Sequence, residues 1–153
     1  MNIVIDPVDS DFSELTHLIS EHNALMRSVS PEESCHVMTI DELRNSDVVL
    51  FKATEEKSVL GMGAILKIGR KHGEVKSMHV QETQRGRGIG RLILRRLIEK
   101  SRSFDWHRLS LETGSTVEFK AARTLYVSEG FSDCAPFGNY VEDRFSTFMS
   151  RTL

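Results

Sequence analysis

Residues 74–98 read EVKSMHVQETQRGRGIGRLILRRLI, and this stretch decides the fold. Residues 74–80 have the composition of a strand, residues 84–90 form a turn rich in glycine and arginine, and residues 91–98 have the apolar spacing of a helix. Glycine lets backbone N–H groups approach an anion without interference from a Cβ atom, and a helix start adds about half a positive charge. The stretch therefore predicts a phosphate or pyrophosphate site at the start of this helix.

Two common phosphate-binding patterns do not fit this turn. A Walker A loop requires GxxxxGK[ST], and no Lys-Ser or Lys-Thr follows the glycines. The dinucleotide fingerprint requires GxGxxG, whereas residues 86–90 have GxGxG. Glu112 keeps a ribose-binding role open as an alternative, because it lies about 20 residues beyond Gly90 at the end of a predicted strand.

Length and composition narrow the class of protein. The chain has 153 residues, of which 39% are hydrophobic and 27% charged, with a formal net charge of -2. This predicts one domain over residues 1–153 and argues against nucleic-acid binding. No basic leader is present, and no apolar run approaches the roughly 20 residues of a membrane span, so we expect a cytoplasmic protein without a membrane partner. Cys35 and Cys134 lack metal-ligand spacing, so we expect no disulfide and no metal.

The order of elements predicts a mixed sheet. Before the opening stretch we expect a strand at 2–6, a helix that starts from Asp9-Ser-Asp11 and ends before Ser30-Pro31, a short helix from the capping box at 39–42, and strands at 47–54 and 58–68. Tight turns join these strands to residues 74–80, which predicts an antiparallel meander.

After the glycine-rich turn the pattern changes. A helical crossover makes residues 108–112 a strand parallel to residues 74–80. A capping box at 115–118 predicts a helix through Tyr126 that ends at Gly130, and residues 131–135 and 145–152 predict a final hairpin.

Two motifs in this order resemble one family. RGRGIG at 85–90 resembles the R/Q-x-x-G-x-G/A signature of the GCN5-related N-acetyltransferases (GNATs), and ARTLYVSEGF at 122–131 is similar to that family's A-x-x-L-Y-x-x-x-G-F helix end. SPEESCH at 30–36, LETG at 111–114 and residues 134–143 resemble the YsnE-like subgroup. The resemblance implies an α/β GNAT fold, with a mixed sheet of six to seven strands, splayed central parallel strands and about four flanking helices.

The same resemblance implies acetyl-CoA as cosubstrate and no metal. Its pantetheine arm would pair with the main chain of Met78, His79 and Val80. Its pyrophosphate would lie on the turn, held by Arg85, Gly86, Arg87, Gly88, Ile89, Gly90 and Arg91. The stripe of Arg91, Arg95 and Arg102 either meets the 3′-phosphate or forms a solvated face. Phe119 stands where the family often has Asn or Gln, so no amide contact to the CoA arm is expected from it.

Three residues carry the implied catalysis. Glu74 is either the base that takes the amine proton or a structural charge paired with Lys76, and a period of two puts Glu74, Lys76, Met78 and Val80 on one face. Tyr126 is expected near the CoA sulfur, where it would protonate or fix the leaving thiolate. The Val80 backbone N–H is the expected oxyanion donor.

The acceptor site is expected between the first two helices and the last hairpin. Its candidates are Ser30, Glu33, Ser34, His36, Glu112, Asn139 and Tyr140. Acetylating a carboxylate would give an anhydride that hydrolyses readily, so we expect an amine of a small molecule or a peptide. A non-catalytic acyl-CoA sensor is the alternative function, and homodimers are common in the family.

Overall fold

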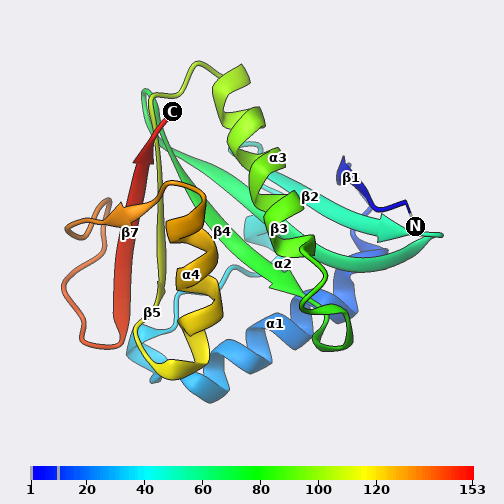
Figure 1. Cartoon of the computed structure of the whole chain (residues 1–153), viewed down its shortest axis with the longest axis horizontal. Coiled ribbons are helices and arrows are strands. Elements are labelled where there is room, and N and C mark those ends of the chain that lie inside the picture. Colours follow the sequence, from blue (N-terminus) through cyan, green and yellow to red (C-terminus); the bar gives the residue numbers. More distant parts are fainter. Residues whose placement is uncertain (1, 10) are drawn as a thin grey trace.

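The computed structural model describes residues 2–9 and 11–153, and one mixed sheet organises them (Figure 1). The sheet has seven strands in the order β1-β2-β3-β4-β5-β7-β6. Their bounds are β1 Val4–Pro7, β2 Val48–Glu55, β3 Ser58–Gly69, β4 His72–Val80, β5 Arg108–Gly114, β6 Ser132–Asp133 and β7 Ser146–Thr152. Four α-helices flank the sheet: α1 Thr16–Val29, α2 Ile40–Leu43, α3 Ile89–Ser103 and α4 Lys120–Ser128. This confirms the predicted fold class.

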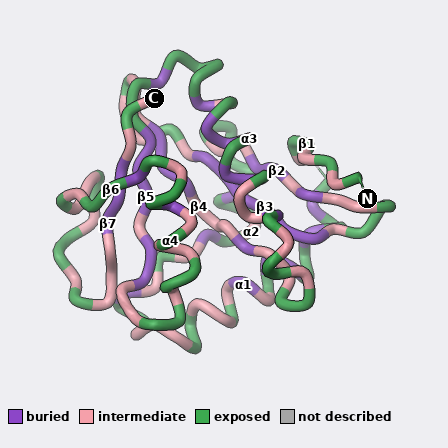
Figure 2. The backbone as a smooth tube through the Cα atoms, in the orientation of Figure 1, coloured by how far each residue is buried: buried purple, intermediate pink, exposed green. Residues whose placement is uncertain are grey.

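Both faces of the sheet carry a hydrophobic core. On one face α3 and α4 cover a cluster that includes Phe51, Ile65, Val75 and Leu97. On the other face α1 and α2 cover a cluster that includes Met62. The buried residues concentrate in the central strands and along α3, whereas turns and chain ends are exposed (Figure 2).

The central strands β4 and β5 separate along their length. They pair in parallel only from His72–Arg108 to Val75–Leu111, and the rest of β4 diverges from β5 (Figure 1). The antiparallel meander of β2, β3 and β4 and the late pairing of β6 with β7 were predicted and are confirmed. The splay leaves main chain of β4 without a strand partner on its β5 side among the described residues.

A β-bulge in β4 contradicts the uniform alternation predicted for residues 74–80. The register with β3 shifts between Met62–His79 and Ala64–Lys76, and Ser77 adopts a positive φ of 57°. The extra residue exchanges the two faces beyond it. The side chains of Glu74 and Lys76 therefore lie on the face of the sheet that is turned away from α3, whereas Met78 and Val80 pack into the cluster beneath α3.

Of the two predicted capping boxes, one forms and the other does not. The Thr39–Glu42 capping box forms, with both reciprocal hydrogen bonds present. The Ser115–Glu118 capping box does not form, because the Ser115 hydroxyl donates to the Arg144 carbonyl oxygen at 2.5 Å and the Ser115 N–H to Phe145. A 3₁₀ turn at Val117–Phe119 precedes α4 instead.

The start of the first helix is also later than predicted. The 3₁₀ turn Ser13–Leu15 precedes α1, and the Asp11 carboxylate accepts a hydrogen bond from the Ser13 N–H at 2.9 Å. Ser10, one of the three predicted caps, lies outside the described residues. The helix ends before Ser30-Pro31, as predicted.

Candidate active site

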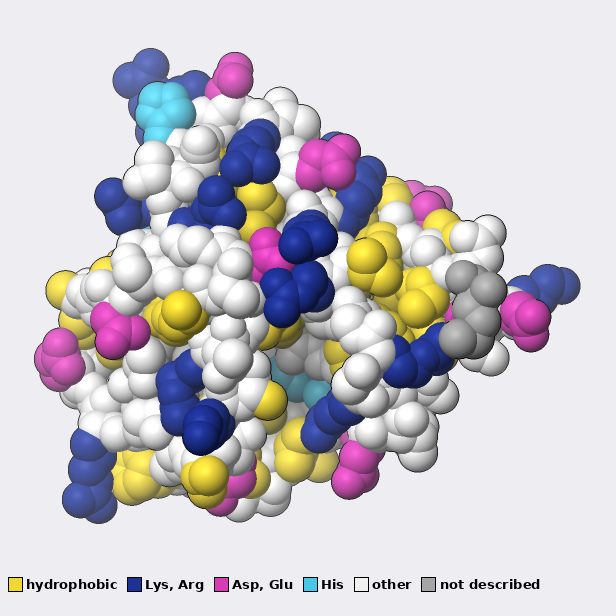
Figure 3. All heavy atoms as spheres, in the orientation of Figure 1, with side chains coloured by type: hydrophobic (Ala, Val, Ile, Leu, Met, Phe, Trp, Pro, Cys, Tyr) yellow, Lys and Arg dark blue, Asp and Glu magenta, His cyan; other side chains and the backbone are white. Residues whose placement is uncertain are grey.

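A cavity of about 690 Å³ occupies the splay between β4 and β5. Residues of β4, the end of α1, the start of α3, β5 and α4 line it. In Figure 3 a hollow opens on the face that carries α3 and α4, with Lys and Arg side chains beside it and histidine within it. Strand β4 runs the length of the cavity, since the rise of a strand puts Glu74 and Val80 roughly 20 Å apart. We call the part near residues 84–91 the turn end and the part near Glu74 the acceptor end.

The glycine-rich turn forms the turn end of the cavity. Gly86 and Gly88 both have a φ of 80°, a left-handed conformation that other residues rarely adopt. Gly88 is the N-cap of α3, and its carbonyl accepts from the Leu92 N–H at 3.1 Å. The N–H groups of residues 89–91, between Gly88 and Leu92, have no carbonyl partner within the helix and are available to an anion. Gly86, Gly88 and Gly90 all line the cavity, as does Ile89.

The arginines of the turn differ in where their side chains go. Arg85 lines the cavity and donates from Nε to the Val80 carbonyl oxygen at 3.1 Å. Arg87, predicted to hold pyrophosphate, instead forms a two-bond ion pair with Glu55, at 3.0 and 3.1 Å, and does not line the cavity. The carboxylate at the end of β2 draws its guanidinium away from the cavity.

The predicted arginine stripe of α3 is largely paired with α4. Arg91 lines the cavity and donates to Glu129 at 2.6 Å and to Ser128 at 2.9 Å. Arg95 donates to the same Glu129 carboxylate at 2.9 Å, and Arg102 is exposed. The stripe therefore joins the two helices beside the cavity.

Main chain of β4 faces the splay at the residues predicted to bind pantetheine. The Gln81 N–H donates to Leu60 on the β3 side. Because successive backbone groups of a strand point to opposite edges, the N–H and C=O of Val80 face the β5 side, and the bond from Arg85 to the Val80 carbonyl agrees. Met78, His79 and Val80 all line the cavity.

A histidine pair connects β4 to α1. The Nδ1 atoms of His22 and His79 lie 3.1 Å apart, so one donates and the other accepts, and His79 Nε2 lies 3.5 Å from Glu21. Burial lowers the pKa of His22 to about 3 and also lowers the pKa of His79, so both rings are neutral near pH 7. Both rings line the cavity, and the pair holds α1 against its wall.

Glu74 is held by neighbours at the acceptor end. Its carboxylate accepts from the Tyr140 hydroxyl at 2.5 Å and lies 3.8 Å from the Lys76 ammonium, and only 5% of the residue is exposed. Burial raises the pKa of Glu74, and Lys76 and Tyr140 offset part of that rise. The pairing with Lys76, left open by the sequence, is present.

Glu112 lines the same cavity from β5 and is half-buried. Burial raises the pKa of its carboxyl to about 7; Ser146 and Lys76 act against this rise, and the carboxylates of Glu74 and Asp143 add to it. A carboxyl that titrates near neutrality in a cavity is suited to accept a proton from a substrate.

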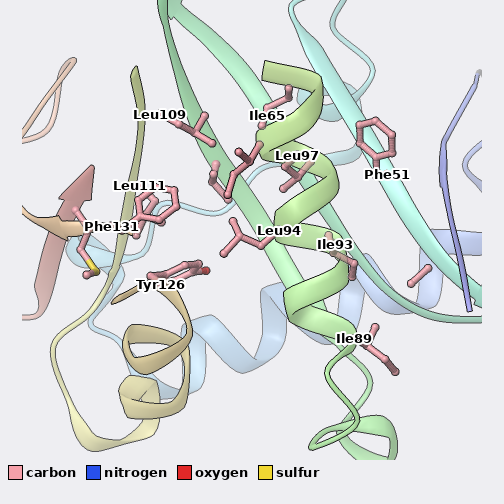
Figure 4. Packing of buried hydrophobic residues seen from close by; sticks show 14 of the residues in the cluster. Phe51, Ile65, Ile89, Ile93, Leu94, Leu97, Leu109, Leu111, Tyr126 and Phe131 are labelled. Atoms are coloured by element: carbon pink, nitrogen blue, oxygen red, sulfur yellow. The ribbon is translucent and has the colours of Figure 1, made fainter. Parts of the chain in front are cut away.

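Tyr126 lies in the core of the α4 side and also lines the cavity. Its ring packs edge-on against Phe131, and its hydroxyl is directed toward α3 (Figure 4). Burial and the Glu112 carboxylate raise the pKa of Tyr126. The phenol therefore stays protonated and is suited to donate a hydrogen bond to a thiolate, not to release its proton.

Besides Glu112, the predicted acceptor residues fall into three groups. Ser30, Ser34 and His36 line the cavity. Tyr140 contacts the acceptor end through two residues that line the cavity: its hydroxyl donates to the Glu74 carboxylate and accepts from the Lys76 ammonium.

Two of the predicted acceptor residues lie elsewhere. Glu33 and Asn139 are exposed and do not line the cavity, because Glu33 lies in the short 3₁₀ turn Glu32–Ser34, which turns it outward, and Asn139 lies in the loop before β7.

His22 and Phe119 also line the cavity, and the sequence predicted a site role for neither. The helical period places His22 on the buried face of α1, and there its ring contacts His79. Phe119 lines the cavity where the family often has an amide, and its ring covers Gly114 so closely that a Cβ there would lie 1.9 Å from it.

Within residues 2–9 and 11–153, no helix is long and apolar enough to cross a membrane. The same residues contain no group of three or more His, Cys, Asp or Glu side chains placed to hold a metal ion.

Comparison with known proteins identifies the family. The acetyltransferase (GNAT) family model matches residues 15–131. The chain is 37% identical over the full length of both chains to YsnE of Bacillus subtilis (strain 168), an uncharacterized N-acetyltransferase, and 39% identical to YedL of Escherichia coli (strain K12), with 92% and 91% of the two chains covered. A GNAT acetyltransferase of Elizabethkingia anophelis, solved with acetyl-CoA bound, shares the fold with a TM-score of 0.73 at 19% identity, covering 99% of each chain. The chain therefore belongs to the GNAT family of acetyltransferases.

Proposed function

We propose that the protein transfers the acetyl group of acetyl-CoA directly to the amine of a small molecule or peptide. The observation that carries this proposal is the continuous cavity along β4, with free helix N–H groups at one end and Glu112 and Tyr126 on its walls. The family acts on amines, and its members bind acetyl-CoA or CoA, as in the Elizabethkingia structure.

Coenzyme A would lie along β4. Its pyrophosphate would meet the N–H groups at the start of α3, with Gly86 and Gly88 leaving room for it, since a Cβ at either position would have no neighbour within 4 Å. The pantetheine amides would pair with the main chain of Met78–Val80 on its β5 side, where the splay leaves β4 without a strand partner among the described residues. The N–H of Val80 would then face the thioester carbonyl oxygen.

Glu112, and not Glu74, is the base in this proposal. The amine nitrogen attacks the thioester carbonyl carbon, its proton passes to the Glu112 carboxylate, and the C–S bond breaks to leave CoA as a thiolate. The Tyr126 hydroxyl donates a hydrogen bond to that sulfur. Glu74 is less suited because Tyr140 already donates to its carboxylate and Lys76 neutralises its charge.

Binding of the cosubstrate is tested by thermal unfolding. Acetyl-CoA at about 100 times its Kd should stabilise the protein by about 2.7 kcal/mol, a rise in Tm of roughly 5–10 °C, whereas NAD and ATP should leave Tm unchanged. Gly88→Trp should abolish the acetyl-CoA shift, because the indole fills the turn. Gly69→Trp, at the end of β3 and away from the cavity, is the matched control and should keep the shift. An acetyl-CoA shift that survives Gly88→Trp would contradict the assigned pyrophosphate site.

A further inference from the structure

The acceptor end of the cavity carries more negative than positive charge. Glu74 and Glu112 line it directly. Asp143 stands behind it, where it accepts a hydrogen bond from the hydroxyl of Ser34, another lining residue. The bonds from Ser34 and from the Phe145 N–H hold the pKa of Asp143 below its usual range, so this carboxylate stays ionised.

The cation at this end is Lys76, and its ammonium group is already bound. Lys76 Nζ donates to the His36 carbonyl oxygen at 2.9 Å and to the Tyr140 hydroxyl at 3.0 Å, and lies 3.8 Å from the Glu74 carboxylate. An ammonium has three N–H donors, of which His36 and Tyr140 take two, and the nearby Glu74 carboxylate balances its charge. The positive charge of Lys76 is therefore already paired with Glu74 and leaves no excess positive charge for a carboxylate on the substrate.

No other positive charge is available at the acceptor end among the residues the structure describes. The remaining lysines and arginines that line the cavity are Arg85 and Arg91, which lie at the turn end and are bonded to Val80 and Glu129. Of the lining histidines, His22 and His79 are neutral, and burial also lowers the pKa of His36.

The end of α1 adds an apolar wall beside these charges. Leu25, Met26 and Val29 line the cavity there, and Val37 continues the wall beyond the 3₁₀ turn. Side chains of this kind pack against a hydrocarbon chain.

We propose that the acceptor is an aliphatic primary amine that carries no carboxylate. The proposal rests on the N-acetyl transfer proposed above and specifies its substrate class. An amino acid would bring its carboxylate toward Glu74, Glu112 and Asp143 without a free cation to receive it, a like-charge arrangement that disfavours binding. An alkylamine instead places its nitrogen at Glu112 and its chain along α1.

Three compounds with the same carbon skeleton test the proposal: butylamine, 4-aminobutanoate and 4-aminobutanamide. Release of the CoA thiol and the mass of the product are followed at several pH values, and each kcat/KM is corrected for the fraction of free amine. We expect kcat/KM for butylamine to exceed that for 4-aminobutanoate by at least about tenfold. The neutral amide should recover most of the loss, because it retains the size of the acid without its charge.

The outcomes separate the substrate class from the reaction. If 4-aminobutanoate is acetylated as well as butylamine, or if the amide is as poor as the acid, the proposed class is wrong while N-acetyl transfer stands. If none of the three is acetylated, and a wider panel of amines and amino acids also yields no product although acetyl-CoA raises Tm, the proposed function fails and the substrate class with it.

Discussion

At the scale of the residue, two glutamates of the same cavity have different surroundings. Glu74 accepts from Tyr140 and lies beside Lys76, whereas Glu112 is half-buried with a pKa near 7. A base is most effective when its pKa is near the working pH, which favours Glu112.

Exchanging each carboxylate for an amide distinguishes the two glutamates. Wild-type kcat/KM should rise with pH through about 7 as Glu112 loses its proton, because only the carboxylate form accepts the amine proton. Glu112→Gln should lower kcat by about 10²- to 10⁴-fold and remove this rise, leaving only the titration of the amine itself. Glu74→Gln is the matched control and should keep the rise. Loss of the rise in Glu74→Gln and its survival in Glu112→Gln would reverse the assignment.

The sequence identified these glutamates as candidates but not which one is neutralised. Tyr140, the partner of Glu74, is 66 positions away in the chain, and no local pattern reports such a contact. The same limit explains Arg87, whose partner Glu55 is 32 positions away. By contrast, the glycines of the turn could be recognised, because their effect on the backbone is local.

At the scale of the element, the bulge in β4 sets the geometry of the site. It lets Glu74 and Lys76 face the acceptor end while Met78 and Val80 anchor the strand under α3.

Element order, the meander and the Thr39 capping box could be predicted from periodicity and turn residues. The bulge could not be predicted, because a serine and not a glycine occupies position 77, where φ is positive. The predicted Ser115 capping box does not form, because the Ser115 hydroxyl donates to the Arg144 carbonyl oxygen instead.

Substitution at Ser77 tests this role of the bulge. A β-branched side chain is strained at a φ of 57°, so Ser77→Val should lower the free energy of unfolding by about 1–3 kcal/mol and raise KM for acetyl-CoA as the main chain beyond it shifts. Ser77→Gly relieves the strain and should keep both values near wild type. Urea unfolding and initial rates measure the two effects. Equal stability of Ser77→Val and Ser77→Gly would show that the positive φ is not required.

At the scale of the whole molecule, the splay of β4 and β5 turns a sheet into a binding site. The parallel pair stops at Val75–Leu111, and the cavity opens beyond it between the helices of both faces. The crossover helix after β4 made a parallel pair predictable, and the family resemblance implied the splay. The lining of the acceptor end was only partly predicted, since Glu33 and Asn139 lie outside the cavity and His22 inside it.

Direct transfer of the acetyl group from acetyl-CoA to an amine is tested most simply by mass spectrometry of acetyl-CoA, butylamine and the protein incubated together. Direct transfer predicts one N-acetylbutylamine for each CoA released, intersecting lines in two-substrate kinetics, and no mass change of the protein when acetyl-CoA is supplied without amine. Acetylation of the protein itself, for example at Cys35 beside the acceptor end, would contradict direct transfer. Binding of acetyl-CoA without product from any amine would contradict the catalytic function and identify the protein as an acyl-CoA sensor.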